Sequence, residues 1–448
     1  MRWLPLLGLP ALLGAFGCGS RSRSADAVTP APSARVVPAP LSAAAPLPTV
    51  DAGPPIPELP RAISLDGFAE GDRIADLAGL AVGDRMLLAW VTYYDEGSAA
   101  ARRKNPARAG SRGAAAGDPG KQGASVVVRA LDKEGEALSQ PKVISSKAVS
   151  FGGVALAQGT GTKNDIALAW VGKDGGVGQV FVTRLSEAGD KQAQKMITHS
   201  KTGCSDVGLA AVAEGFVVAW LESNQDGTDL FAAKIGRDMG RVGAERRIAQ
   251  TKGEASDVRV VPRGDELLVL WSEVRGEGEG GIAAARLVTA DLAVRGDPGL
   301  VVTAPRHARG LDLARVGDGV EVAWIEDATP AAADAGAPIR EMGLVRLDAS
   351  GKNPSGRSVV QAPGDPSSVA LDCERVCRMV VPVAEHGELA LYGFSYDLSQ
   401  RPGTPRRFAS FTGVSTEDTS PVLVKDWLFF AEDNLRGGGR IRKAKLAW

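Results

Sequence analysis

Leu87-Leu88-Ala89-Trp90 is a four-residue phrase that recurs along this chain of 448 residues. Nearly the same pattern returns as Ala167-Leu168-Ala169-Trp170, Val217-Val218-Ala219-Trp220, Leu268-Val269-Leu270-Trp271 and Glu321-Val322-Ala323-Trp324. Successive Trp residues are separated by 80, 50, 51 and 53 residues. The underlying repeat is therefore about 50 residues once an insertion in the first interval is allowed for, a length that suits a four-stranded β-propeller blade.

Two degenerate copies follow at the same spacing and raise the count to seven. They are Met379-Val380-Val381-Pro382 and Trp427-Leu428-Phe429-Phe430, where Phe430 takes the place of the Trp. In the third copy, strands are expected near residues 207–212, 216–221, 229–235 and 247–249, because alternating or β-branched runs there are separated by turn residues. The sequence thus predicts an all-β chain of seven four-stranded antiparallel blades.

The two ends of the chain are expected to meet in one blade. No fourth strand follows the seventh copy, whereas Arg61-Ala62-Ile63-Ser64 resembles fourth strands such as Lys142-Val143-Ile144-Ser145. Completing the last blade with this N-terminal strand would remove exposed sheet edges and give a monomeric disc. Residues 61–448 thus resemble seven-bladed β-propellers and, in architecture, the repeat-bearing lipoproteins of Gram-negative bacteria, a resemblance that implies no particular activity.

The N-terminus has the pattern of an export signal. Residues 1–17 contain one positive charge and a short apolar run, and they end at Ala15-Phe16-Gly17-Cys18. This ending resembles the lipobox of bacterial lipoproteins, which implies lipidation of Cys18 and, with Gly19 after it, an outer-membrane location. The family usually has Leu where this chain has Ala15, and the same residues suit ordinary signal peptidase. Lipid anchoring and plain export to the periplasm or medium therefore both remain open.

Residues 18–60 are dominated by Ala, Pro and Ser, and we expect them to form a disordered tether. Composition narrows the function classes further. The chain carries 52 Lys+Arg against 53 Asp+Glu, so nothing indicates a nucleic-acid partner. With 3 His and 4 Cys it has few residues for a metal site, and we expect no metal and no cofactor.

Four copies carry Glu two residues after the aromatic position, namely Glu222, Glu273, Glu326 and Glu432. The two-residue period of a strand places each on the same face as the aromatic, near the turn between the second and third strands. If these turns ring the axial opening, the carboxylates form a partial acidic collar for a cation or a basic loop. The alternative is that they are solvated or pair with nearby bases.

Two insertions fall in the same turn of different copies, at residues 95–125 and 328–340. The first is basic and is expected to be a disordered loop that contacts anionic lipid, lipopolysaccharide or an acidic protein, unless it is a tolerated insertion without a partner. Its candidate binding residues are Arg102, Arg103, Lys104, Arg108 and Arg112.

Cys373 and Cys377 flank a short turn in the sixth copy, and export favours a disulfide between them. Cys204 is left over. The three His residues fall in different copies, and the chain lacks the GxSxG, HExxH and Walker motifs and the aspartate box of sialidase-like propellers, so no catalytic residue is assigned.

The sequence therefore favours a non-enzymatic, envelope-anchored interaction module that binds an envelope protein or polysaccharide through one loop face. It places two alternatives behind this interpretation. One is a saccharide-acting propeller hydrolase or lyase, and the other is a binder of a small ligand or cation in the axial channel.

Overall fold

The computed structural model describes most of the chain after residue 60. The described residues are 61–62, 73–94, 123–149, 152–161, 165–251, 253–275, 280–304, 308–327, 340–352, 357–361, 364–397, 403–412, 421–433 and 439–446. The predicted export signal, the predicted tether and Cys18 lie outside them, as do Arg102, Arg103, Lys104, Arg108 and Arg112 of the predicted basic loop. No described segment forms a helix with the length and apolar character needed to span a membrane.

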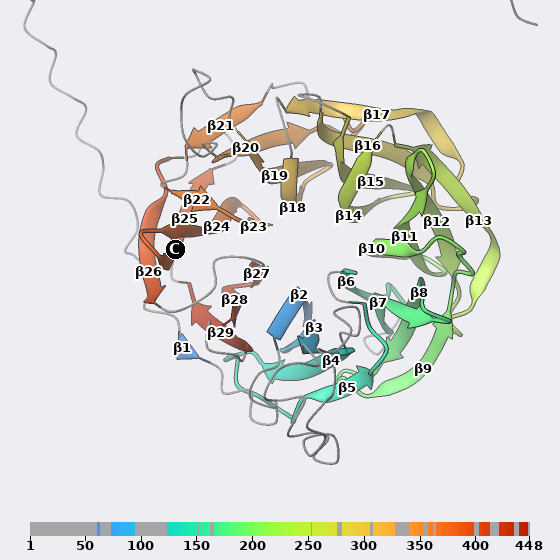
Figure 1. The fold of residues 1–448 in the computed structure, drawn as a ribbon, viewed down its shortest axis with the longest axis horizontal. Coiled ribbons are helices and arrows are strands. Elements are labelled where there is room, and N and C mark those ends of the chain that lie inside the picture. Colours follow the sequence, from blue (N-terminus) through green and yellow to red (C-terminus); the bar gives the residue numbers. More distant parts are fainter. Residues whose placement is uncertain are drawn as a thin grey trace, which may run out of the picture. The chain divides into compact units, whose positions relative to one another are not determined.

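The described residues form seven antiparallel sheets arranged in a ring, which confirms the predicted seven-bladed β-propeller (Figure 1). Blade 1 contains β2 (Arg73–Val82), β3 (Arg85–Tyr94), β4 (Gly123–Asp132) and β5 (Lys142–Ser145). Blade 2 contains β6 (Val154–Gln158), β7 (Ile166–Asp174), β8 (Val177–Leu185) and β9 (Lys191–Met196). Blade 3 contains β10 (Cys204–Val212), β11 (Gly215–Asn224), β12 (Gly227–Ile235) and β13 (Arg241–Gln250).

Blade 4 contains β14 (Glu254–Arg263), β15 (Glu266–Val274), β16 (Gly280–Val288) and β17 (Val294–Ala304). Blade 5 contains β18 (Ala308–Val316), β19 (Gly319–Asp327), β20 (Arg340–Leu347) and β21 (Ser358–Gln361). Blade 6 has a divided inner strand, β22 (Asp365–Pro366) and β23 (Ala370–Cys373), followed by β24 (Val376–Glu385), β25 (Glu388–Asp397) and β26 (Arg406–Thr412). Blade 7 contains β27 (Pro421–Val424), β28 (Trp427–Asp433) and β29 (Gly439–Lys445).

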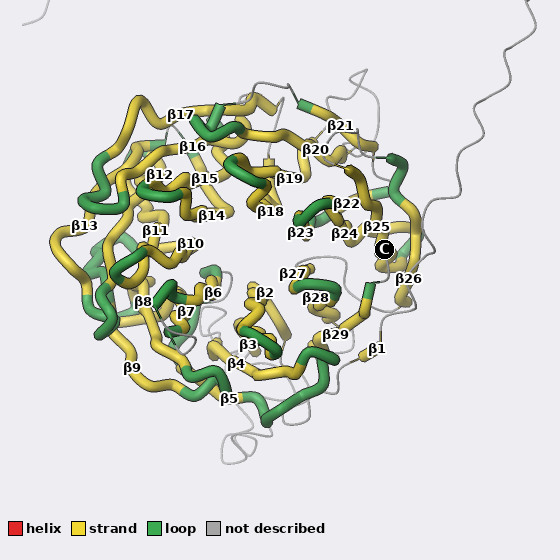
Figure 2. The backbone as a smooth tube through the Cα atoms, turned by 180° about the vertical axis from the view of Figure 1, so that it is seen from behind, coloured by secondary structure: helices red, strands yellow, loops and turns green. Residues whose placement is uncertain are grey.

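The ring closes as the sequence predicts. Strand β1 (Arg61–Ala62) pairs antiparallel with β29, so the N-terminal strand is the fourth strand of blade 7. Figure 2 shows the inner strands of the blades around the centre of the ring. Because both ends of the propeller share one sheet, blade 7 is held by chain segments almost 400 residues apart.

The recurring Trp residues form the core between neighbouring blades. Trp90, Trp170, Trp220, Trp271 and Trp324 are each at most 1% exposed. Trp220, for example, lies in a cluster with Val182 and Ala169 of the preceding blade. In blade 6 the position equivalent to the Trp is occupied by Val381, which packs against blade 5. The sequence alignment had placed Pro382, the next residue, at this position. A shift of one residue along a strand moves a side chain to the other face, so the alignment of this degenerate copy was wrong by one position.

Acid–base pairs repeat near the turns of several blades. A base on the third strand pairs with an acid at or near the start of the second: Arg184 with Asp165 at 3.3 Å, Arg286 with Glu266 at 2.8 Å and Arg346 with Glu321 at 3.3 Å. These pairs join strands within one sheet, so their role is structural.

Candidate active site in the axial channel

The inner strands carry a recurring residue with left-handed backbone geometry. Asp76, Gly153, Asp206, Asp257 and Gly310 have φ between 49° and 81°. Four of the five lie at a register irregularity between the first and second strands of their blades, and Gly153 directly precedes β6. Such geometry favours Gly, and Asp and Asn tolerate it better than most other residues.

These aspartates join neighbouring blades through the backbone. Asp76 Oδ2 accepts the N–H of Gly153 at 3.2 Å, and Asp257 Oδ2 accepts the N–H of Gly310 at 3.1 Å. Asp206 Oδ2 accepts the N–H of Asp257. Each of these three carboxyl groups therefore bonds to the N–H of the left-handed residue on another inner strand. We call this incomplete ring of three hydrogen bonds around the axis the belt.

A cavity of about 640 Å³ lies inside this belt and is lined by the inner strands of all seven blades. Its charged lining residues are Asp76, Asp206, Asp257, Asp312, Asp372, Arg259 and Arg315. None of the described lining residues is aromatic. The cavity is therefore a polar pocket at the axis, rich in carboxyl groups.

Arg259 is the central cation of this pocket. Arg259 lies two positions after the left-handed residue of its inner strand. The residues at the same position in blades 1–3, which also line the pocket, are small: Ala78, Ala155 and Gly208. The guanidinium donates to the backbone oxygen of Val258 at 3.1 Å. Burial by itself would lower the pKa of Arg259, but the surrounding carboxylates, with that of Asp312 first, raise it. Arg259 therefore stays charged in the pocket.

Two carboxyl groups beside Arg259 have pKa values near neutrality. Burial, followed by the charge of Asp257, raises the pKa of Asp206 to about 7. Burial raises the pKa of Asp312 to about 6, against the opposing effects of Arg259 and of the Leu371 N–H, which donates to Asp312 Oδ2 at 2.8 Å. At neutral pH, Asp206 holds its proton more readily than Asp312. The pocket thus contains a carboxylic acid and a carboxylate of the kinds used in acid–base catalysis.

Asp257 is held in place by several donors. Its Oδ2 accepts the hydroxyls of Ser272 at 2.9 Å and Ser256 at 3.1 Å in addition to the Gly310 N–H. Ser272 is 1% exposed and lies on β15, behind the inner strand. This network fixes the carboxylate that lies next to Asp206.

The Glu residues of the expected collar have other roles in the structure. Glu273 and Glu326 are 1% and 0% exposed, and they accept the indole N–H of Trp271 at 3.1 Å and of Trp324 at 2.8 Å. Glu273 also pairs with Arg275 at 2.7 Å, and Glu326 pairs with Arg357. These two acids are therefore buried with bases between blades.

The other two collar residues differ from this pair. Glu222 is half-buried and accepts the hydroxyl of Ser200 at 2.8 Å. Glu432 lies on β28, where its backbone pairs with Arg440. Glu222 is not among the described residues that line the axial pocket.

The cysteines are arranged as follows. Cys373 and Cys377 form a disulfide across the turn between β23 and β24, and Cys373 lines the axial pocket. Cys204 is a buried free thiol whose pKa is raised to about 11, chiefly by burial. In the part of the chain that the structure describes, no group of three or more His, Cys, Asp or Glu residues is arranged to hold a metal ion.

The pocket aspartates did leave a signal in the sequence. Asp76, Asp206 and Asp257 each lie 14 residues before the Trp of their copy, a spacing as regular as the Trp pattern itself. This second repeat lies before the Trp, whereas the predicted collar of Glu residues lies after it. Asp312, which is 12 residues before Trp324, follows no such repeat.

We expect the contribution of Asp206 to stability to fall as the pH rises from about 5 to about 7, because its pKa is about 7 in the folded state and 3.8 ordinarily, so the folded state binds the proton more tightly. Asp206→Asn keeps an oxygen that accepts the Asp257 N–H but cannot titrate. Its melting temperature should therefore depend less on pH than that of the wild type. Differential scanning fluorimetry across this range measures the effect.

The exposed Asp190, whose pKa is lowered mainly by its hydrogen bond with Lys142, provides the control. Asp190→Asn should leave the slope between these pH values unchanged. A slope in Asp206→Asn as steep as in the wild type would contradict the assignment of the titration to Asp206.

Comparison with known proteins finds a similar fold in solved structures of low sequence identity. No family model and no curated protein sequence matches the chain. A solved polysaccharide lyase, an ulvan lyase bound to a saccharide of GlcA and Rha3S, is 8% identical with a TM-score of 0.53; the match covers 85% of this chain and 95% of the lyase. An α-L-arabinofuranosidase from Fusarium graminearum with an iminosugar inhibitor is 10% identical with a TM-score of 0.49, covering 84% of this chain and 96% of that enzyme.

An α-L-arabinanase from Penicillium chrysogenum, complexed with arabinobiose, is 12% identical with a TM-score of 0.45, covering 65% of this chain and 91% of the arabinanase. Of these three structures, the ulvan lyase has a TM-score above 0.5 and is a saccharide-acting enzyme, and this finding corrects two interpretations of the sequence. The preference for a non-enzymatic interaction module was wrong, as was the preference against an enzyme. At these identities the likeness itself establishes the fold alone.

Proposed function

We propose that this protein is a glycoside hydrolase that binds a neutral saccharide in the axial pocket. The observation that carries the proposal is the meeting of Asp206, Asp312 and Arg259 in one cavity of about 640 Å³. A cavity of this size accommodates a small saccharide unit. The similarly folded ulvan lyase supports the choice of saccharides, because it is a propeller-like chain that acts on a saccharide.

The roles follow from the environment of each group. Asp206, with the higher pKa, is the general acid that protonates the oxygen of the glycosidic bond. Asp312, which faces Arg259, is the second carboxylate and either activates water or attacks the sugar carbon. Arg259 keeps its charge and donates hydrogen bonds to sugar hydroxyls.

The charge of the pocket favours a neutral substrate over an anionic one. Five aspartates and two arginines line the cavity, so carboxyl groups outnumber cations. A chain of uronic acids or sulfated sugars would bring further negative charge into this surrounding, at an electrostatic cost. We therefore propose hydrolysis of a neutral chain and place β-elimination of an anionic chain second.

The test is a screen of the full-length protein against neutral polysaccharides such as arabinan, galactan and xylan, and against polygalacturonate and ulvan. The expected result is release of reducing ends from a neutral chain. Formation of unsaturated uronic acid, seen by its ultraviolet absorbance, would identify a lyase instead. Neither product, together with no binding of any polysaccharide by calorimetry, would refute the proposal.

Export and attachment to the outer membrane through Cys18 belong to the same proposal, supported by the N-terminal sequence pattern. An exported hydrolase would meet polysaccharides outside the cell. Mass spectrometry of the mature N-terminus distinguishes a lipid-bearing Cys18 from an unmodified one.

A further inference from the structure

The inner strand of blade 6 differs from its counterparts because it is divided. Strands β22 and β23 both pair with β24, and β23 contains only four residues, 370–373. The disulfide between Cys373 and Cys377 closes the β23–β24 hairpin at the end of this short strand. A strand with so few ladder bonds depends on the disulfide for its position more than a long strand would.

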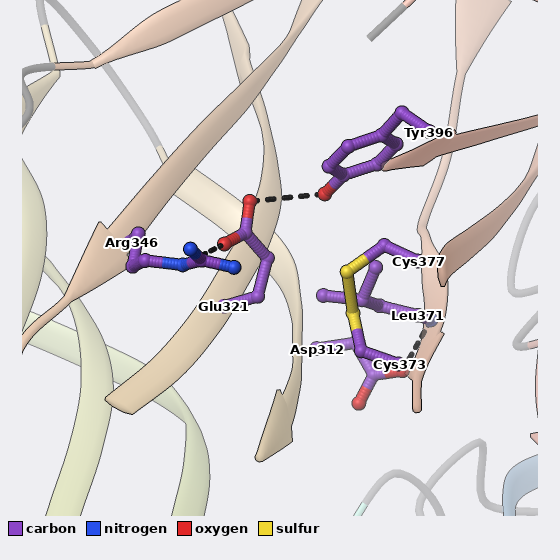
Figure 3. Close-up of a disulfide and its surroundings, with 7 residues drawn as sticks. All are labelled: Asp312, Glu321, Arg346, Leu371, Cys373, Cys377 and Tyr396. Atoms are coloured by element: carbon purple, nitrogen blue, oxygen red, sulfur yellow. Dashed lines mark hydrogen bonds and ion pairs between the residues drawn. A yellow bond between two sulfur atoms is a disulfide. The ribbon is translucent and has the colours of Figure 1, made fainter. Parts of the chain in front are cut away.

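Strand β23 supplies a donor to the pocket. The N–H of Leu371 donates to Asp312 Oδ2 at 2.8 Å across the boundary between blades 5 and 6. Figure 3 shows this bond beside the disulfide, with Leu371 two residues before Cys373. The position of β23 therefore determines where the Leu371 N–H lies. A movement of β23 would change the hydrogen bonding of the Asp312 carboxylate.

A second contact holds the same two blades together independently of β23. The hydroxyl of Tyr396 on β25 donates to Glu321 Oε1 at 3.0 Å, and Arg346 pairs with Glu321 Oε2 at 3.3 Å (Figure 3). Glu321 and Tyr396 are 7% and 6% exposed. Loss of the disulfide should therefore loosen the end of the β23–β24 hairpin, next to Leu371, while blades 5 and 6 stay packed.

We infer that the Cys373–Cys377 disulfide is a redox-sensitive positioning element for Asp312, so that its reduction withdraws the Leu371 N–H and changes the charge of the axial pocket. The effect on saccharide cleavage rests on the proposed function, whereas the effect on Asp312 does not. Cys373 lines the pocket and is 8% exposed, while Cys377 is fully buried, so Cys373 is the sulfur that a small thiol can reach.

The reductant is a dithiol. Its thiolate attacks the sulfur of Cys373 and forms a mixed disulfide, and the sulfur of Cys377 leaves and takes up a proton. The second thiol of the dithiol then closes onto the first and releases Cys373. Two electrons and two protons pass to the protein, which gains two thiols, and the dithiol becomes a disulfide.

The groups facing Asp312 determine the direction of the change. Arg259 on β14 and the N–H groups of Leu371 and Leu313 lower the pKa of Asp312, while burial and the charge of Asp372 on β23 raise it. Removing the Leu371 N–H takes away one of the lowering contributions. Reduced protein should therefore hold a proton on Asp312 at a higher pH than oxidised protein does.

The experiment uses the full chain carrying Cys204→Ser, so that the disulfide cysteines are the only described ones that titrate with thiol reagents. Melting temperature is measured against pH for the oxidised protein, for protein reduced with dithiothreitol and for the variant Cys373→Ser/Cys377→Ser. For each form of the protein, the same profile is measured with Asp312→Asn added. The difference between the two melting-temperature profiles gives the part that is due to the titration of Asp312. Reduction should move this part upward by about one pH unit, a tenfold increase in proton affinity.

Tyr396→Phe is the matched control, because it removes a different contact between the two blades and leaves the disulfide intact. It should lower the melting temperature at every pH without moving the Asp312 part of the profile. The inference is overturned if fully reduced protein keeps the oxidised profile, or if reduction produces the same shift in Asp312→Asn. A Tyr396→Phe shift equal to that of reduction would also overturn it, since general loosening would then explain both.

Hydrolysis of the neutral polysaccharide found in the screen is followed in the same samples. If the titration moves but no form of the protein cleaves a saccharide, the inference about Asp312 holds and the proposed function fails. If the oxidised protein cleaves and the titration does not move, the proposed function holds and the inference fails.

Discussion

Replacing Glu326 with alanine is expected to destabilise the propeller by about 3–5 kcal/mol, the range for breaking a buried ion pair by removing one partner. Glu326 is fully buried and accepts the indole N–H of Trp324 at 2.8 Å. It also pairs with Arg357, which donates to the backbone oxygen of Thr303 on blade 4 at 3.1 Å. The alanine variant leaves the indole and the largely buried guanidinium without this carboxylate between two blades.

Urea denaturation followed by tryptophan fluorescence measures the loss of stability. Glu222→Ala is the matched control, because Glu222 occupies the same place two residues after a Trp but is half-buried and accepts only hydroxyl groups. It should cost about 1 kcal/mol or less. Equal losses in the two variants would show that burial with Trp324 and Arg357 contributes nothing beyond a surface hydrogen bond.

Asp206→Asn is expected to reduce hydrolysis of the saccharide substrate by at least about 100-fold, the lower end of what a general acid contributes. The amide keeps an oxygen that accepts the Asp257 N–H, so the belt around the axis is preserved while the transferable proton is lost. In the wild type, burial raises the pKa values of both Asp312 and Asp206 toward neutrality, which predicts a bell-shaped pH profile with its optimum near neutral pH. The variant should lose the fall in rate on the alkaline side.

Asp76→Asn is the control for this second prediction. Asp76 has the same left-handed geometry and the same kind of bond to another blade, with φ of 50° and a 3.2 Å bond to the Gly153 N–H. It should lose less than about tenfold in activity, because it is not assigned a proton transfer. A loss equal to that of Asp206→Asn would indicate that the belt as a whole, and not Asp206, controls the rate.

Most of the fold could be predicted because it is written in local periodicity. The repeat of about 50 residues, marked by Trp in five copies, indicated seven blades. The seventh copy lacks a fourth strand, which indicated that the N-terminal strand near residue 61 closes the ring, as β1 does. The Cys373–Cys377 pairing was equally local, since four residues separate the two cysteines across a turn. In the degenerate sixth copy, which lacks the Trp, the alignment slipped by one residue.

The site could not be predicted in the same way. Asp206, Arg259 and Asp312 come from three different blades and meet only because the inner strands converge on the axis. Glu273 and Glu326 lie beside the Trp of their blades, but the Trp face is the one that packs against the preceding sheet, so the carboxylates are buried. Whether a face is solvent or core depends on its neighbour, which the two-residue period of a strand does not reveal.

The sequence by itself therefore determined the number of blades, their strands, the closure of the ring and the disulfide, because each depends on spacing within one repeat or on the two ends of the chain. The tertiary structure alone decided which carboxyl groups share a cavity, which are paired with bases in the core and which have pKa values near neutrality. Those properties are set by burial and by charges from other blades, and both act through space between residues that are about 50 positions apart in the chain.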